Sequence, residues 1–154
     1  MPISLPRWIA HRGGGKLAPE NTLAGIRLAA RLGYRAVEFD VMLSADGTPV
    51  LIHDETLERT TNGRGQVCDT PDAVLFALDA GHGQRIPRFA EAAALCRELG
   101  LLANVEIKPA TGHELATAEV VARMTADLWR GVEVPPLISS FSLAALEVAR
   151  DLAP

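Results

Sequence analysis

Short apolar runs alternate along this chain with segments in which apolar residues recur at the spacing of an amphipathic helix. Such alternation is typical of βα units, in which helices join parallel strands and cover the sheet. We therefore predict an α/β fold. With 154 residues, 48% of them hydrophobic, the chain can bury one sizeable core, so we expect a single domain over residues 1–154.

Five apolar runs are predicted strands, and four periodic segments are predicted helices. The strands are expected at 8–10, 36–43, 50–53, 101–108 and 137–141, and the helices over 23–30, 89–99, 120–128 and 143–149. Asn21 is placed to cap the first helix and Gly33 to end it. The pair Asp46-Gly47 could close either a hairpin or a tight loop. From Asp54 to about residue 85 the periodicity weakens, which predicts an excursion from the sheet.

Charge and cysteine content exclude several classes of protein. Lys and Arg total 15 against 19 Asp and Glu, a net charge of −4, which argues against a nucleic-acid binder. Cys68 and Cys96 lack the spacing of a disulfide framework or zinc site, and reduced thiols fit a cytoplasmic protein. Residues 1–8 show no lysine-rich start before a long apolar region, so we expect a chain that is neither exported nor stably associated with a membrane.

Acidic residues alternate with apolar ones in two of the predicted strands. This is unusual, because parallel strands covered on both faces normally read as continuous apolar runs. Glu38 and Asp40 share one face of their strand, and Glu106 lies on the polar face of another. Buried like charges require a compensating cation, and carboxylate oxygens suit hard divalent ions. We predict that these three residues bind a divalent cation, Mg²⁺ as first choice and Ca²⁺ as alternative. Acids on an exposed edge strand would instead be merely solvated.

Two histidines are candidates for proton transfer. His11 and His53 both follow apolar runs, so both should emerge at the carboxyl ends of strands, where α/β proteins place their active sites. A structural role in a loop is the alternative for each. His82 and His113 stand beside glycines in loop-like contexts and are expected to be structural.

Arg12 and Lys108 bring positive charge to the same strand ends and suit phosphate oxygens. Together with three carboxylates, a divalent cation and neutral histidines, they would balance the charge of one phosphodiester. Ion pairs with the acids are the alternative. The run Gly13-Gly14-Gly15 lacks the spacing of a phosphate-binding loop and is interpreted as close backbone packing.

Six ordered motifs closely resemble the glycerophosphodiester phosphodiesterase family. They are His11-Arg12-Gly13, Pro19-Glu20-Asn21-Thr22, Glu38-Phe39-Asp40-Val41, Leu51-Ile52-His53-Asp54, Leu57 to Gly63 (LERTTNG) and Val105-Glu106-Ile107-Lys108. The resemblance implies a TIM-barrel (β/α)8 fold and metal-dependent hydrolysis of glycerophosphodiesters to glycerol 3-phosphate and an alcohol such as choline or ethanolamine.

The resemblance also implies roles for individual residues. His11 and His53 would be the acid/base pair, and Glu38, Asp40 and Glu106 the metal ligands. Arg12 and Lys108 would contact the phosphate or the rest of the substrate, and residues 54–87 would be the family's inserted segment. The attacking nucleophile would be water or the substrate's own glycerol hydroxyl.

A complete TIM barrel has eight strands and about 250 residues, whereas this chain offers about five βα units. We therefore expect an incomplete barrel whose open sheet edges could lead to self-association. Two other functions stay open at this point. One is a non-catalytic or truncated fragment that binds metal or phosphate; the other is a relative of phospholipase C or sphingomyelinase D, which would need an apolar or basic rim facing a membrane.

Overall fold

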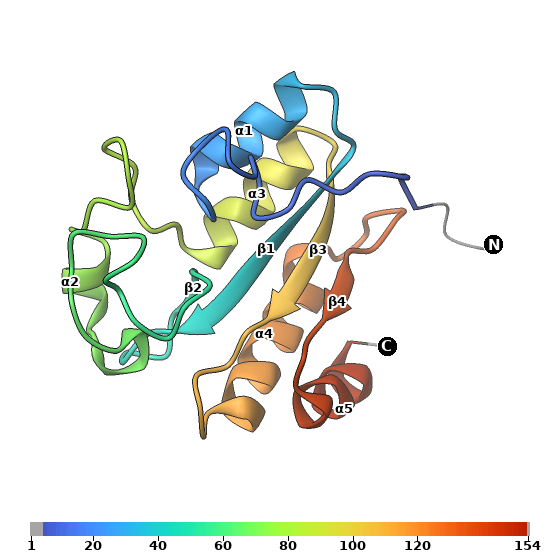
Figure 1. The fold of residues 1–154 in the computed structure, drawn as a ribbon. Coiled ribbons are helices and arrows are strands. Elements are labelled where there is room, and N and C mark those ends of the chain that lie inside the picture. Colours follow the sequence, from blue (N-terminus) through green and yellow to red (C-terminus); the bar gives the residue numbers. More distant parts are fainter. Residues whose placement is uncertain (1–4, 154) are drawn as a thin grey trace.

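The computed structural model describes residues 5–153, so the first four residues of the N-terminal segment considered above lie outside it. Figure 1 shows the arrangement of the helices and strands. In chain order these are α1 (Leu23–Arg31), β1 (Ala36–Leu43), β2 (Pro49–Leu51), the short 3-10 helix η1 (Val67–Asp69), α2 (Asp72–Leu75), α3 (Phe89–Glu98), β3 (Leu102–Ile107), α4 (Glu114–Leu128), β4 (Leu137–Ser139) and α5 (Leu143–Leu152).

The sheet has the order β2-β1-β3-β4, and β1, β3 and β4 run parallel. Ala10 forms a parallel bridge to Val37, so the first apolar run lies along the N-terminal part of β1. Each of these four parallel segments is followed by a helix that packs against the sheet or its neighbouring helix. The predicted α/β fold and incomplete barrel are confirmed.

The number of βα units is four rather than about five. The run expected at 50–53 forms the short strand β2, which pairs antiparallel with the end of β1. The pair Asp46-Gly47 closes this hairpin, where Gly47 has φ +77° and donates its N–H to the carbonyl of Ser44 at 3.0 Å. A strand that turns back on its neighbour needs no crossover helix, so β2 begins the excursion instead of a new unit.

Helix α1 begins and ends close to the predicted positions, but its cap differs. The hydroxyl of Thr22, and not the side chain of Asn21, accepts the hydrogen bond from the Gly25 N–H at 3.2 Å. The side chain of Asn21 binds Asp40 instead. After the helix, Gly33 takes φ +86°, the left-handed conformation that commonly follows a helix end.

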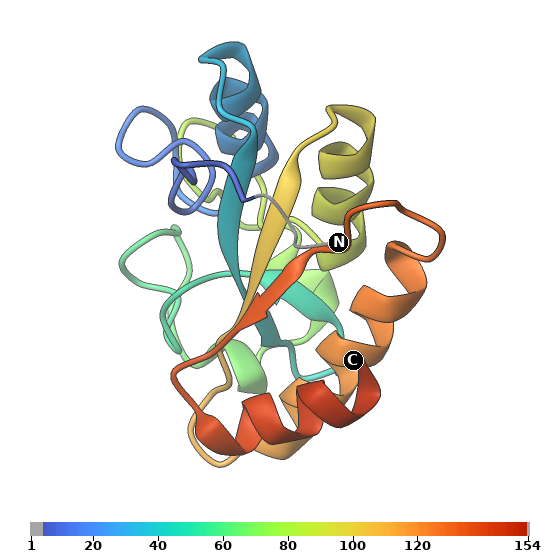
Figure 2. The ribbon, with the colours of Figure 1, turned by 90° about the vertical axis from the view of Figure 1, so that its right-hand side faces the viewer.

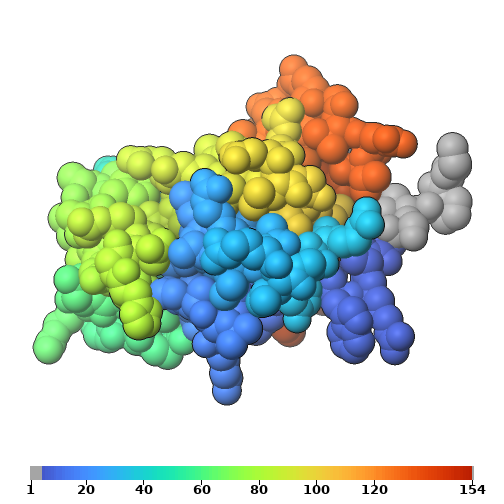
Figure 3. Space-filling view, turned by 90° about the horizontal axis from the view of Figure 1, so that it is seen from above, coloured from blue at the N-terminus to red at the C-terminus, as the bar shows by residue number. Residues whose placement is uncertain are grey.

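The main core lies between the sheet and the row of helices α1, α3, α4 and α5. In Figure 2, α3 and α4 stand to the right of the strands, with α1 at the top and α5 across the lower end, and α1 and α3 lie side by side from above in Figure 3. Phe89 joins the layers, because its ring centroid is 6.1 Å from that of Phe39 on β1 and 6.0 Å from that of Trp129 after α4. Val37, Phe39 and Val41 face this core, which directs the acids of β1 to the opposite face.

The excursion after β1 has a smaller core of its own. Met42 and Val50 from the hairpin pack there with Leu57, Val67 and Leu75. The hydroxyls of Ser44 and Thr48 each donate to Asp72, both at 2.6 Å, which ties the hairpin to α2. The predicted excursion is therefore a packed structure that holds the segment carrying His53 in place.

Within residues 5–153, no helix combines the length and the apolar character needed to cross a membrane. Cys68 is a half-buried free thiol, and Cys96 is a free thiol in the main core.

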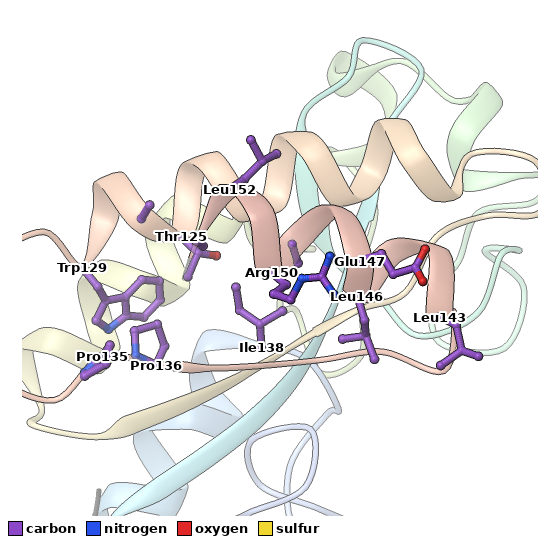
Figure 4. A pocket seen from close by; sticks show the side chains of 13 residues that line it. Thr125, Trp129, Pro135, Pro136, Ile138, Leu143, Leu146, Glu147, Arg150 and Leu152 are labelled. Atoms are coloured by element: carbon purple, nitrogen blue, oxygen red, sulfur yellow. The ribbon is translucent and has the colours of Figure 1, made fainter. Parts of the chain in front are cut away.

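At the outer side of β4, the structure described for residues 5–153 ends the sheet without a further strand. An apolar cavity of about 840 Å³ opens beside this edge, between α4, α5 and β4. Figure 4 shows Trp129, Ile138, Leu146 and the two prolines of the α4–β4 loop around it. This cavity lies on the helix-covered face, because Ile138 pairs with the core residue Val105, and it is separate from the acidic residues.

Candidate active site

Three carboxylates converge on the face of the sheet opposite the main core. Asp40 and Glu106 are direct neighbours in the β1–β3 register, and Glu38 lies two residues before Asp40. One oxygen from each lies within 4.8 Å of the others. Glu38 and Asp40 are only 7% and 1% exposed, and Glu106 is half-buried. The alternative of merely solvated acids therefore fails for the two residues on β1.

The electrostatics of the cluster favour a cation. Burial raises the pKa of Glu38 to about 7, and the charges of Asp40 and Glu106 add to this shift, while the Arg12 N–H partly opposes it. Oε1 of Glu38 and Oε1 of Glu106 are buried and have no hydrogen-bond partner. Buried acceptors normally find partners. The residues present therefore fit a hard divalent ion, which would satisfy both atoms and offset the like charges.

Asp40 is held by two neighbours from the segment before α1. The Asn21 amide donates to Oδ2 of Asp40 at 2.9 Å and accepts the Asp40 backbone N–H at 3.2 Å. Nε of Arg12 lies 3.7 Å from the same carboxylate oxygen. These contacts fix the orientation of the Asp40 carboxylate. The sequence alone predicts only the face of the strand on which Asp40 lies.

His11 follows Ala10 at the carboxyl end of the first parallel segment, as predicted. Its Nε2 lies 3.8 Å from Oε2 of Glu38, and its side chain is largely exposed. The loop after it packs tightly on α1: a Cβ at Gly13 would lie 3.0 Å from the backbone N of Ile26. Gly13 also donates its N–H to the Glu38 carbonyl at 3.0 Å. Gly13 and Gly14 therefore serve close backbone packing, as expected, whereas a Cβ at Gly15 would meet nothing within 4 Å.

His53 reaches the site by a different route from the predicted one. It follows the antiparallel strand β2, so it does not stand at the carboxyl end of a parallel strand. The hairpin returns the chain to the level of the acids, where the Ile52 N–H donates to the Asp40 carbonyl at 3.2 Å. Nδ1 of His53 lies 2.6 Å from Oδ1 of Asp54, and Nε2 lies 2.9 Å from Nζ of Lys108.

The two predicted phosphate contacts, Arg12 and Lys108, form ion pairs with acids. Nη1 of Arg12 donates to Glu20 at 2.9 Å, and Nζ of Lys108 lies 3.6 Å from Oε1 of Glu106. Lys108 also lies 5.6 Å from the ring centroid of Phe141, an exposed side chain just after β4. The ion-pair alternative is thus realised, and it leaves both cations beside the carboxylate cluster.

His82 and His113 are exposed in loops, and no hydrogen bond or ion pair found for residues 5–153 joins either to the cluster. Their structural interpretation therefore stays as predicted. Four residues that shape the site were not assigned to it from the sequence. They are Glu20, Asn21, Asp54 and Arg59. The pair His53-Asp54 carried a usable signal, because an adjacent carboxylate can fix a histidine tautomer.

Comparison with known proteins agrees with the family resemblance of the sequence motifs. The profile of the "Glycerophosphoryl diester phosphodiesterase family" matches residues 11–154. A glycerophosphodiester phosphodiesterase from Caldanaerobacter subterraneus is 38% identical over 153 residues, covering 95% of this chain and 62% of the relative. Human glycerophosphodiester phosphodiesterase 1 is 41% identical over 125 residues, which are 75% of this chain and 37% of the relative.

Solved structures agree with the sequence relatives. A phosphodiesterase from Oleispira antarctica, determined in complex with the product sn-glycerol-3-phosphate, superimposes with a TM-score of 0.89 and 41% identity. This match covers 96% of the chain and 62% of that protein. The chain therefore spans less than two thirds of the length of the proteins to which it is similar.

Proposed function

Since this chain belongs to the glycerophosphoryl diester phosphodiesterase family, we propose that it carries the catalytic half of a metal-dependent phosphodiesterase. The reaction is hydrolysis of a small glycerophosphodiester to glycerol 3-phosphate and an alcohol. The observation that carries the proposal is the convergence of Glu38, Asp40 and Glu106 within 4.8 Å, with two histidines and two cationic side chains around them.

The three carboxylates are the proposed ligands of a divalent cation, with Mg²⁺ preferred and Ca²⁺ as the alternative. Two of their oxygens are buried and have no hydrogen-bond partner, which supports this role. When bound, such a cation supplies Lewis-acid stabilisation of the negative charge that develops on the phosphate. The protein's own part is to hold the ligands in place through Asn21 and the backbone N–H of Arg12, which donates to Glu38 at 2.8 Å.

Arg12 and Lys108 are the proposed phosphate contacts. Both lie against the carboxylate cluster, so a phosphodiester seated there would meet positive charge from two directions. The guanidinium of Arg12 suits phosphate oxygens through its planar pairs of donors. Lys108 donates to His53 here and would exchange that contact for a phosphate oxygen, which would free Nε2 of the histidine.

His11 and His53 are the proposed acid/base pair: one takes the proton of the attacking water or glycerol hydroxyl, and the other gives a proton to the leaving alkoxide. Lysine ammonium groups only donate, so Nε2 of His53 accepts from Lys108, and Nδ1 carries the proton that it donates to Asp54. The tautomer that leaves Nε2 free for proton transfer is thereby selected. His11 is exposed beside Glu38, where it can reach a bound substrate.

The test is release of glycerol 3-phosphate from glycerophosphocholine and glycerophosphoethanolamine, measured with Mg²⁺, with Ca²⁺ and with a chelator. The same assay is run on a version of the chain extended to the length of its relatives. We expect turnover that the chelator abolishes, and weaker turnover for the 154-residue chain. No hydrolysis by the extended version with either ion would contradict the proposal.

We also propose a cytoplasmic location, supported by two free cysteines and no disulfide among residues 5–153. Of the alternatives from sequence, the phospholipase-like one would need a rim that contacts a membrane. Hydrolysis of glycerophosphocholine but not of intact phospholipid vesicles would separate the two activities.

A further inference from the structure

Arg59 lies in the loop that follows His53 and contacts two different carboxylates. Its Nε and Nη2 donate to Asp54 at 2.6 and 2.9 Å. Its Nη1 and Nη2 donate to Glu20 at 2.9 and 2.8 Å. Glu20 is 39 residues away in sequence and belongs to the segment before α1. One guanidinium thus joins the excursion to the loop that follows the first strand.

Both carboxylates bound by Arg59 contact a side chain of the proposed active site. Asp54 lies 2.6 Å from Nδ1 of His53, and Glu20 accepts from Nη1 of Arg12 at 2.9 Å. A continuous chain of contacts therefore runs from Arg12 through Glu20, Arg59 and Asp54 to His53. Arg59 is its central member. It lies between the two carboxylates of the chain and donates two hydrogen bonds to Asp54 and two to Glu20.

We propose that Arg59 is a positioning residue that holds His53 and Arg12 at a fixed separation and orientation, through Asp54 and Glu20 respectively. The inference deepens the proposed function and rests on it only for the roles of His53 and Arg12. Arg59 itself touches neither the carboxylate cluster nor a reacting group. Its effect is to keep His53, the proposed proton-transfer group on the excursion, at a fixed position relative to Arg12, the proposed phosphate contact in the segment before α1.

The geometry makes this network stronger than an ordinary surface ion pair. Isolated exposed pairs contribute little, because water screens them and two flexible side chains must be ordered. Arg59, whose side chain is 46% exposed, instead uses both edges of its guanidinium on carboxylates that are only 22% and 26% exposed. Such paired hydrogen bonds fix direction as well as distance.

The acidity of the carboxylates agrees with this arrangement. Hydrogen bonding from Arg59 is the largest cause that holds the pKa of Asp54 below its usual range, and it does the same for Glu20. Both groups therefore stay ionised and keep accepting from His53 and Arg12. If Arg59 were lost, Asp54 would keep its place next to His53 in sequence but would lose the partner that sets its orientation.

The experiment is ¹⁵N NMR of the histidine rings in the 154-residue chain at fixed neutral pH, which distinguishes the Nδ1–H and Nε2–H tautomers without any turnover. The chain has four histidines, so single substitutions assign the signal of His53. The variants are Arg59→Met, Arg59→Lys and, as matched control, Arg64→Met. Arg64 is an exposed arginine of the same loop, with no hydrogen bond to either carboxylate.

We expect the wild type and Arg64→Met to show His53 as the Nδ1–H tautomer, and Arg59→Met to show a mixture of tautomers. Arg59→Lys should fail to restore the wild-type signal, because one ammonium group cannot bind two carboxylates with paired hydrogen bonds. A His53 signal that Arg59→Met leaves unchanged would overturn the inference.

A second variant keeps the test decisive if Arg59→Met does not fold. Glu20→Met removes both acceptor oxygens of Glu20, and with them the bond to Arg12, but leaves the Arg59–Asp54 bonds, so the His53 tautomer should persist while the Arg12 guanidinium protons exchange faster with water. Unchanged exchange at Arg12 would contradict the positioning role on that side.

In an active, extended version of the chain, Arg59→Met should lower kcat by about 10- to 100-fold, with a smaller change in KM, because misplacement near 1 Å has costs of this order. The two proposals can fail separately. A tautomer that depends on Arg59 in a chain with no hydrolysis would contradict the proposed function alone, whereas full activity in Arg59→Met would contradict the positioning role alone.

Discussion

Asn21 binds Asp40 at both its backbone and its side chain: the amide accepts the Asp40 N–H at 3.2 Å and donates to Oδ2 at 2.9 Å. Asn21 itself has φ +55°, a conformation that asparagine tolerates better than most residues. Asn21 was predicted to cap α1, but it supports the buried carboxylate of Asp40 instead, and Thr22 caps the helix.

Asn21→Gly tests this support without adding backbone strain, because glycine adopts positive φ freely. Loss of an outer partner of a metal ligand typically weakens metal affinity by about 10- to 100-fold. The unpaired Asp40 N–H should lower the free energy of unfolding by about 1–3 kcal/mol. Calorimetric titration with Mn²⁺ and denaturant unfolding measure the two effects. Asn21→Ala should bind equally weakly but be less stable, and unchanged Mn²⁺ affinity in Asn21→Gly would contradict the assignment.

Glu38 should make the metal-free chain less stable as the pH rises. Its pKa is about 7 in the folded chain, above the ordinary value of 4.5, so the folded state binds the proton more tightly. The stabilisation is complete below pH 4.5 and is lost as pH rises to about 7, a change of about 3 kcal/mol. Urea unfolding in EDTA from pH 4.5 to 8 measures this, and Glu38→Gln should flatten this part of the pH dependence. Glu119→Gln, which changes an exposed carboxylate on α4, should not.

Divalent cations should raise the melting temperature of the chain. An ion at about 100 times its Kd stabilises the native state by about 2.7 kcal/mol, provided that it does not bind the unfolded chain. Melts in Mg²⁺, Ca²⁺, Mn²⁺ and EDTA test this, with Glu106→Gln expected to lose most of the response and Glu119→Gln to keep it. Identical melts in all four conditions, with no Mn²⁺ bound at the cluster in a soaked crystal, would exclude the metal site.

Substitution of either proposed acid/base residue should abolish most of the turnover. Each proton transfer contributes about 10² to 10⁴ in rate, so His11→Ala and His53→Ala in an active version should lose at least 10²-fold. His82→Ala and His113→Ala should stay within a few-fold of the parent enzyme. Release of glycerol 3-phosphate and circular dichroism separate loss of catalysis from loss of folding. Full activity in His53→Ala would rule out the paired-histidine mechanism.

The open edge of β4 should cause the 154-residue chain to self-associate. Unpaired strand groups recruit further strands, and an apolar cavity of about 840 Å³ lies beside this edge. Light scattering should therefore give a mass above 16.4 kDa, rising with concentration. A cooperatively melting monomer of 16.4 kDa at all concentrations would show that the edge is stable when exposed.

Periodicity in the sequence determined the larger part of this structure. Acids at positions 38 and 40 alternate with core residues, and side chains alternate between the faces of a strand, so the carboxylates had to share the face opposite Phe39. The helices follow from their own 3.6-residue period and from local signals such as Gly33. These patterns act within a few residues, and for that reason they can be read before the fold is known.

Tertiary structure decided what depends on distant segments. The antiparallel direction of β2, which brings His53 to the level of Asp40, follows from pairing with β1 and not from the apolar run itself. Asn21 reaches Asp40 across 19 residues, and Arg59 reaches Glu20 across 39. Asparagine and arginine at these positions could each bind several partners. Which partner they bind depends on which side chains meet once the excursion folds against the sheet, so only the tertiary structure determines it.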